Sequence, residues 1–210
     1  MTDSSPSPIS LADVGLTIGL PALTTLAWAL PVPTWQRFCH GVGGLNAATL
    51  TGDPADTGAK IDALRGDHLP QLDAPTLIRR AAGEDLAATM TTLRCYRPFA
   101  APPKVRVIGA EHVTNALANG KGVILWVGLF VHGSFVAKVG MHQAGFAVGH
   151  LSHPRHGFSD TRFGMAILNK ARTVAEDRFL GARIKMGLDS ATAALRTLRE
   201  WLDEIGRAHV

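Results

Sequence analysis

Histidine and serine residues that could move protons or hold anions gather in two short segments. The first is Val131-His132-Gly133-Ser134, and the second is HLSHPRHGFS over residues 150–159. Five of the nine histidines fall between His132 and His156. An imidazole can act as a general base near neutral pH. Arginine side chains and the free N–H groups at a helix start can hold a phosphate. Proton transfer and anion binding are therefore the chemistry to consider.

Each segment coincides with the end of a predicted strand. The nearly continuous apolar run over residues 122–130 predicts a strand buried on both faces, and residues 146–151 predict another. In open parallel sheets, ligands bind beyond the carboxyl ends of the strands. We therefore expect both segments to open onto one crevice.

Regular alternation after Pro103 supports this placement. The pattern predicts strands over 104–108 and 183–186, and helices over 111–119, 132–144, 159–180 and 189–203. Strands that alternate with helices across short turns are typical of a parallel sheet with right-handed crossovers. The predicted fold class is α/β, a parallel-type sheet flanked by helices, with its core at 104–203.

The residues before this core have a different composition. Residues 1–13 are mostly polar and rich in Pro and Ser, so we expect disorder. Residues 14–36 contain no charged side chain. Their length permits a transmembrane helix, but glycine, proline and threonine interrupt the run. A helix lying in one leaflet is favoured over a true span or a buried soluble helix, and Trp28 and Trp35 suit a membrane interface.

The region over residues 37–103 is expected to be helical and loop-like. Residues 41–75 are rich in Gly, Pro, Asp and Thr, with a short helix possible around 60–65. Apolar spacing predicts a helix over 74–96, which Arg97-Pro98 ends.

Composition narrows the classes of partner. Hydrophobic residues make up 46% of the 210 residues and charged residues 18%, and mean hydropathy is +0.13, which suits contact with lipid. The net charge of +4 fits anionic headgroups or a phosphate-bearing acyl donor, but no basic stripe indicates nucleic acid. Cys39 and Cys95 lie far apart and are expected to be reduced thiols.

The last seven residues, EIGRAHV over 204–210, back-translate to the start of a widely used sequencing-library adapter. We expect this tail to be a sequencing artefact, and the natural reading frame to continue differently after Asp203. The α/β core would then be incomplete at its C-terminal side.

The order of an apolar N-terminal segment, a helical stretch and then GKGVILWVGLFVHGSF resembles the lysophospholipid acyltransferase superfamily. Within it, the lipid A biosynthesis lauroyltransferase-like proteins are the most similar branch. The resemblance covers roughly residues 13–203. It implies transfer of a fatty acyl group from acyl-CoA or acyl carrier protein to a lipid hydroxyl, at the cytoplasmic face of a bacterial inner membrane and without a cofactor.

The resemblance also implies roles for residues. His132 falls where the family places the histidine of an H-x4-D/E block, the general base on the acceptor hydroxyl. The acid five positions later is missing, because Ala137 occupies that position. Either His132 acts alone, or an acid such as Asp160 or Glu176 replaces the missing one, or the chain does not catalyse this step. His132 could also merely cap the following helix.

The family holds phosphate with basic and polar residues after the next strand. Here the corresponding candidates are Ser134, His150, Ser152, Arg155, His156, Ser159 and Arg162. A solvated loop with an N-cap at Ser159 is the alternative. Glu176, Arg178 and Arg183 resemble a charged block of this family, and an intramolecular Glu–Arg pairing is the favoured interpretation.

Other chemistries fit less well. The spacing of His150, His153 and His156 could place three ligands on one metal, but Pro154 and Gly157 oppose a regular helix, so no metal is expected. Ser134 lacks the G-x-S-x-G pattern of a hydrolase nucleophile. The competing functions are a non-catalytic membrane-surface protein that keeps the fold, and another membrane transferase acting on a phosphorylated sugar or lipid.

Overall fold

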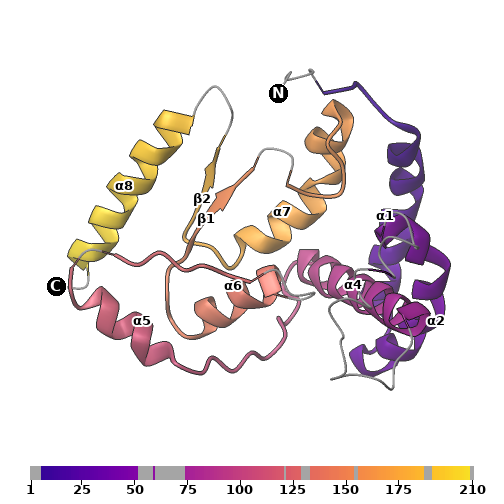
Figure 1. The fold of residues 1–210 in the computed structure, drawn as a ribbon, viewed down its shortest axis with the longest axis horizontal. Helices are drawn as coiled ribbons and strands as arrows, with labels where there is room; N and C mark the ends of the chain where they lie inside the picture. Colours follow the sequence, from indigo (N-terminus) through magenta and orange to yellow (C-terminus); the bar gives the residue numbers. More distant parts are fainter. Residues whose placement is uncertain are drawn as a thin grey trace.

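The computed structural model describes residues 6–51, 59, 74–120, 122–128, 133–153, 156–186 and 191–208. Helices dominate these residues, and two short strands form a parallel pair (Figure 1). The predicted mixture of helices with a parallel sheet is confirmed at this coarse level. The expected short helix around 60–65 lies outside the described residues.

Helix α1 (Leu11–Ala29) begins with a capping box. The Ser10 hydroxyl accepts from the Asp13 backbone N–H at 3.2 Å, and the Asp13 carboxylate accepts from the Ser10 N–H at 2.7 Å. The helix ends at Ala29, and the C-cap residue Leu30 has the extended backbone expected directly before Pro31. The expected disorder of residues 1–13 is therefore wrong for residues 11–13, which form the first turn, and residues 1–5 lie outside the described part. The expected apolar segment over 14–36 is divided between α1 and the next helix.

Helices α2 (Val32–Thr51) and α4 (Ala74–Tyr96) pack closely against each other, and α4 also packs against α1. The predicted bounds of the helix over 74–96 are confirmed. Residues 41–51 fall in the region expected to be helical and loop-like, and in the structure they are helical, because α2 continues to Thr51. Glycines allow this contact, since a Cβ on Gly43 would lie 2.6 Å from the Gly83 nitrogen. A core shared by the three helices contains Leu20, Ala27, Trp35, Cys39, Met90 and Leu93.

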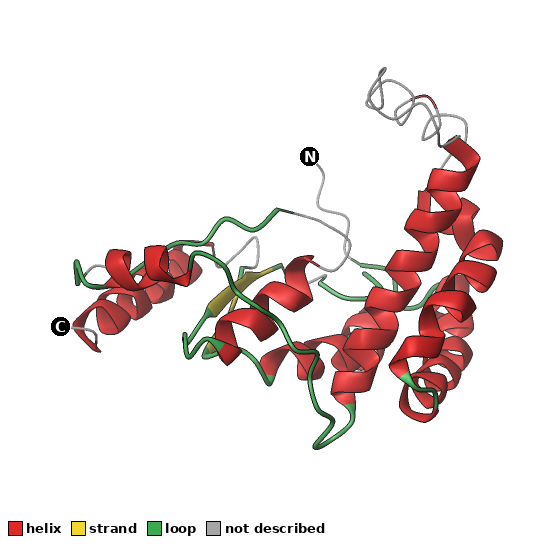
Figure 2. Ribbon diagram, turned by 90° about the horizontal axis from the view of Figure 1, so that it is seen from below, coloured by secondary structure: helices red, strands yellow, loops and turns green. Residues whose placement is uncertain are grey.

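The second half of the chain surrounds the two strands. Figure 2 shows these elements beside the N-terminal helices, and α4 contacts α7 between the two groups. In chain order they are α5 (Ala110–Leu117), α6 (Gly133–Gln143), β1 (Gly149–Ser152), the π-helix η2 (Gly164–Leu168), α7 (Lys170–Asp177), β2 (Ala182–Lys185) and α8 (Ala191–Ala208). The helix α8 continues past Asp203 into the stretch that we expected to be an artefact.

The strands β1 and β2 pair in parallel, with Gly149 opposite Ala182 and Ser152 opposite Lys185. The two predicted strands nearest these positions are confirmed with shifts of one to three residues at their ends. A second core of Cys95, Phe135, Val139, Ala175 and Phe179 joins α4, α6 and the end of α7. This core holds α6 and α7 together.

Two other predicted strands are not strands in the structure. At residues 104–108, a side chain takes the place of a partner strand. Gln143 Oε1 accepts from the Val105 N–H at 3.0 Å, and Gln143 Nε2 donates to the neighbouring Pro103 carbonyl at 2.8 Å. Residues 122–128 have no regular secondary structure, and residues 124–128 are exposed, with Trp126 97% accessible. Neither segment has a neighbouring strand among the described residues, and an unpaired segment cannot form a sheet. Residues 129–130 lie outside the described part.

Candidate functional site

A buried carboxylate organises the polar residues near the end of β1. Glu176, in the last turn of α7, has no exposed surface. Its Oε2 lies 3.0 Å from Lys138 Nζ, 2.8 Å from Arg183 Nη2 and 3.0 Å from His156 Nε2. Its Oε1 lies 3.2 Å from Arg172 Nε. We call Glu176 and these four partners, together with His150, the Glu176 cluster.

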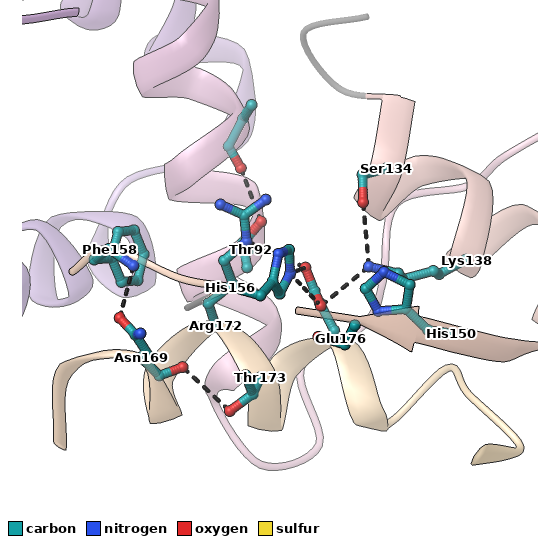
Figure 3. A network of polar contacts seen from close by, with 12 residues as sticks. Thr92, Ser134, Lys138, His150, His156, Phe158, Asn169, Arg172, Thr173 and Glu176 are labelled. Carbon is teal, nitrogen blue, oxygen red and sulfur yellow. Dashed lines mark hydrogen bonds and ion pairs between the residues drawn. The ribbon is translucent and has the colours of Figure 1, made fainter. Parts of the chain in front are cut away.

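Five separate elements build the Glu176 cluster, and Figure 3 shows its members from α6, β1, the turn after β1 and α7. The side chains come from α6 (Lys138), β1 (His150), the turn after β1 (His156), α7 (Arg172 and Glu176) and β2 (Arg183). Parallel pairing of β1 with β2 brings Arg183 opposite His150. The cluster therefore depends on tertiary structure, and no short sequence motif contains it.

Glu176 is ionised in this environment. Burial alone would raise the pKa of the Glu176 carboxyl, but the hydrogen bond from His156, the charge of Lys138 and the hydrogen bond from Arg183 lower it far below its usual range. A buried negative charge is stable only with such partners. The negative charge of Glu176 in turn holds three cationic side chains in place.

The two imidazoles of the Glu176 cluster differ in the contacts that fix the positions of their protons. Burial and the nearby charge of Lys138 lower the pKa of His150 to about 4, so this ring is neutral at pH 7. Its Nδ1 lies 3.2 Å from Arg183 Nη1, and a guanidinium can only donate. The proton of neutral His150 therefore sits on Nε2.

His156 is held by its carboxylate partner. Because ionised Glu176 only accepts, His156 Nε2 donates to it, at 3.1 Å from Oε1 and 3.0 Å from Oε2. The Nδ1 atom of His156 has no partner among the described residues. The His150 and His156 rings meet edge-on with centroids 5.3 Å apart. An imidazole fixed by an acid on one nitrogen can accept a proton on the other.

The ligand atoms of His150, His156 and Glu176 lie within 4.8 Å of one another, as in a possible metal site. The residues around them oppose a cation. Lys138 and Arg183 already contact Glu176 Oε2, Arg172 contacts Oε1, and Arg183 donates to His150 Nδ1. Like-charge repulsion would act on any divalent ion placed there. The arrangement suits an anion better than a metal.

Half of the candidate site residues meet at this place. His150 and His156 belong to the Glu176 cluster, and two predicted serines border it. Lys138 Nζ donates to Ser134 Oγ at 3.2 Å, and Arg183 Nη1 donates to Ser152 Oγ at 3.2 Å. His132 and Arg155 lie outside the described residues.

The other two candidates, Ser159 and Arg162, belong to a different contact. The Ser159 N–H donates to Asn169 Oδ1 at 3.0 Å, and the Arg162 N–H donates to the Ser7 carbonyl at 2.9 Å. Ser159 is also not the N-cap that we considered, since Thr161 Oγ1 accepts from the Gly164 N–H at 2.9 Å. These residues hold the chain before α1 and form no part of the Glu176 cluster.

Asp13 is the acid of this second contact. Thr161 Oγ1 donates to Asp13 Oδ2 at 2.8 Å. The pKa of Asp13 is lowered to about 2 by hydrogen bonding from Ser159, and further by Thr161 and Ser10, against burial, which raises it. Asp160, one of the acids proposed from the sequence, is exposed and does not join the Glu176 cluster.

Two expectations about charges can be compared with the contacts. The predicted pairing of Glu176 with Arg183 is confirmed at 2.8 Å. Arg178 does not pair with Glu176, because its guanidinium donates to the carbonyls of Cys95, Arg97 and Ala100 at the end of α4. The sequence reasoning missed Lys138 and Arg172. Lys138 had a signal, since it is the one charged residue among the apolar side chains of FVAKVG.

Comparison with known proteins does not assign this chain to a family. No protein-family model, curated protein or solved structure matches this chain.

Proposed function

We propose that this chain takes part in acyl transfer from a thioester carrier, acyl-CoA or acyl carrier protein, to a lipid hydroxyl at a membrane surface. The observation that supports it most directly is the pair formed by His156 and buried, ionised Glu176, at 3.0 Å. The resemblance of the sequence supplies the reaction class. The pair supplies a group that could deprotonate a hydroxyl, even though Ala137 replaces the expected acid.

The proposed step is a single substitution at a carbonyl carbon. Nδ1 of His156 takes the proton of the acceptor hydroxyl as its oxygen attacks the thioester carbon. The C–O bond forms, the C–S bond breaks, and the proton passes to the thiolate of the carrier. An ester and a free thiol result, so no oxidant or reductant is required. General-base catalysis of this kind contributes on the order of 10²–10⁴-fold in rate.

The cations of the Glu176 cluster would serve the anionic parts of the reaction. Lys138, Arg172 and Arg183 carry three positive charges, against the charges of Glu176 and of Asp177, which pairs with Arg183 at 2.6 Å. An excess of positive charge remains in a partly buried place. Such a place can stabilise a developing oxyanion or hold a phosphate of the donor or acceptor.

His132 remains the base that the family resemblance implies. Ser134, two positions later in the sequence, borders the Glu176 cluster through Lys138. The proposal therefore contains two candidate bases, and substitution separates them.

The experiment measures transfer of a labelled long-chain acyl group from acyl-CoA and from acyl carrier protein to a bacterial lipid extract in mixed micelles. The variants are His156→Ala, His132→Ala and, as a control, His112→Ala in exposed α5. We expect His156→Ala to lose about 10²-fold or more of the rate and His112→Ala to behave as the unsubstituted chain. Circular dichroism confirms that each variant is folded.

Each outcome has a definite consequence. A loss in His132→Ala alone would assign the base to His132 and leave His156 a structural role. Transfer that no histidine variant lowers, or no transfer with either carrier, would contradict the enzymatic proposal.

A non-catalytic membrane-surface protein is the second candidate. Ala137 favours it, since this residue is half-buried on α6 and provides no acid at the family position. This function predicts that lipid binding persists while acyl transfer is absent with both carriers.

A further inference from the structure

Helix α1 is apolar on its outward face as well as on the face that packs against α4. The outward residues follow one another at helical spacing, and the two most exposed large ones, Leu11 and Ile18, are 88% and 73% accessible. We call Leu11, Val14, Ile18, Ala22, Thr25 and Ala29 the α1 outer face. A surface helix in water carries polar residues on its outward side. The α1 outer face carries no charged residue. Its composition is therefore that of a surface in contact with apolar groups and not with water.

The threonines of α1 also suit an apolar environment. Thr17 and Thr24 each donate their hydroxyl to the backbone carbonyl four residues earlier at 2.7 Å, and Thr25 does so at 3.0 Å. Thr17 and Thr25 are exposed, yet their hydroxyls are satisfied within the helix. Polar groups in lipid must be satisfied internally in this way.

The N-terminal end of α1 is fastened to the folded body. Asp13 accepts from Thr161 at 2.8 Å. Just before the helix, the Ser7 and Pro8 carbonyls accept from the backbone N–H groups of residues 162–163 at 2.9 and 3.1 Å.

The other end of α1 is fastened to α4. Trp28 Nε1 donates to the Leu93 carbonyl at 2.9 Å, and Arg94 Nη1 donates to the carbonyls of Ala27 and Leu30 at 3.0 and 3.2 Å. A helix of 19 residues is about 28 Å long at about 1.5 Å per residue, close to the thickness of the hydrocarbon core, about 30 Å. A span would place its two ends on opposite sides of the membrane, but both ends are bound to the same body. The helix must therefore lie along a surface.

The residues around the C-terminal end of α1 indicate that the α1 outer face contacts lipid and not another protein. The Arg97 guanidinium lies 5.9 Å from the ring centroid of half-buried Trp28, whereas Trp35, also expected at the interface, is only 4% exposed and belongs to the helical core. Arg37 is exposed in the next helix. Tryptophans beside cationic side chains are typical of the headgroup region of a membrane, where anionic lipids attract the cations.

We propose that the α1 outer face inserts into one leaflet of a bilayer that contains anionic lipid, with α1 parallel to the membrane plane and the whole chain on one side. The proposed acyl transfer requires contact with a lipid, and the α1 outer face would provide the surface for that contact. Lipid contact does not require catalysis, so the two can fail separately.

The first experiment measures sedimentation of the full chain with vesicles of equal parts phosphatidylcholine and phosphatidylglycerol. Ile18→Glu removes an apolar contact and adds a charge on the α1 outer face. The matched control is Leu195→Glu, which changes an apolar side chain on α8 that is 56% accessible. We expect Ile18→Glu to weaken vesicle binding about tenfold or more, and Leu195→Glu to leave it unchanged.

The second experiment determines whether α1 crosses the bilayer. Ile9→Cys and Val32→Cys place thiols just beyond the two ends of α1 and outside the α1 outer face, at side chains that are 54% and 53% accessible, and a membrane-impermeant maleimide is added outside sealed vesicles. Cys39 and Cys95 are buried, and burial raises the pKa of both thiols, so they react slowly. We expect both introduced thiols to react from outside.

Three results would overturn the proposal. They are vesicle binding that Ile18→Glu leaves intact, labelling of one end only, and a change of oligomeric state in Ile18→Glu with vesicle binding unaltered, which would assign the face to a protein contact. Acyl transfer to a detergent-dispersed acceptor, measured in the same variants, shows whether catalysis survives when membrane binding is lost.

Discussion

Glu176 carries a negative charge in a place that solvent does not reach, and its neighbours explain how. Three cationic side chains and one imidazole meet its two oxygens. Those cations depend equally on Glu176, because Lys138 is itself buried and burial lowers its pKa against the opposing effect of the carboxylate. The residues of the Glu176 cluster therefore stabilise one another, and loss of the central acid affects all of them.

Substitution of Glu176 by Gln tests this dependence. The change leaves three buried or half-buried cations without their counter-charge, and removing one partner of a buried pair costs about 3–5 kcal/mol. We expect the free energy of unfolding to fall by this amount in urea denaturation. Asp177→Asn is the control, since Asp177 is 49% exposed and pairs only with Arg183 among the described residues, and its loss should cost about 1 kcal/mol or less.

His150 should make the stability of the fold depend on pH. The pKa of His150 falls from 6.5 to about 4, chiefly through burial and then through the charge of Lys138. Between these values the unfolded chain binds a proton that the folded chain does not, so stability falls as the pH is lowered from about 6.5 to about 4. His150→Gln should flatten this part of the stability profile measured by urea unfolding, whereas His112→Gln should not. Equal slopes in all three proteins would contradict the assignment.

The sequence predicted part of this site for a physical reason. His150, Ser152 and His156 lie at or just after a strand end, and the rule that ligands bind there brings them together. The same rule does not select Lys138, and its signal, a lone lysine among apolar residues of a helix, is usually explained by an exposed position. Only the structure shows that Lys138 is buried, with its Nζ atom 3.0 Å from the Glu176 carboxylate.

At the scale of elements, the contact between α2 and α4 depends on glycine. A Cβ on Gly43 would lie 2.6 Å from the nitrogen and 2.7 Å from the Cα of Gly83, which are backbone atoms and cannot rotate away. Gly41→Ala provides a matched control two residues earlier in the same helix, where a Cβ meets nothing within 4 Å.

The two alanine substitutions should have opposite effects. Gly43→Ala forces the helices apart, and we expect a loss of about 1–3 kcal/mol. Gly41→Ala should stabilise by up to about 1 kcal/mol, because alanine favours the helix. Thermal and urea unfolding measure both. A gain in stability in Gly43→Ala would show that the helices are not in close contact there.

The same contact explains why some elements could be predicted and others could not. The helix over 74–96 has apolar spacing of its own and a proline-containing stop, both visible in the sequence. Residues 41–51 are rich in glycine, and the sequence set no helix bounds there, but packing against α4 outweighs their low helix propensity. Strands are harder, because a strand exists only with a partner. Residues 104–108 contact the Gln143 side chain instead.

At the scale of the whole molecule, the two strands in the described part of the chain form too small a sheet to cover every apolar segment. Residues 122–128 were predicted as a buried strand, yet Ile124 is 74% and Trp126 is 97% accessible. An exposed, unpaired apolar run is a template for association with other chains. The structure and the sequence pattern therefore make different predictions about the same residues.

Ile124→Lys distinguishes the two. If Ile124 is exposed, as in the structure, the substitution should change the free energy of unfolding by no more than about 0.5 kcal/mol, and it should reduce self-association in sedimentation velocity. Ile184→Lys is the control, because Ile184 in β2 is only 7% exposed and a buried unpaired charge should cost several kcal/mol. If the two substitutions were equally destabilising, Ile124 would be buried, as the sequence predicts for a strand of a larger sheet.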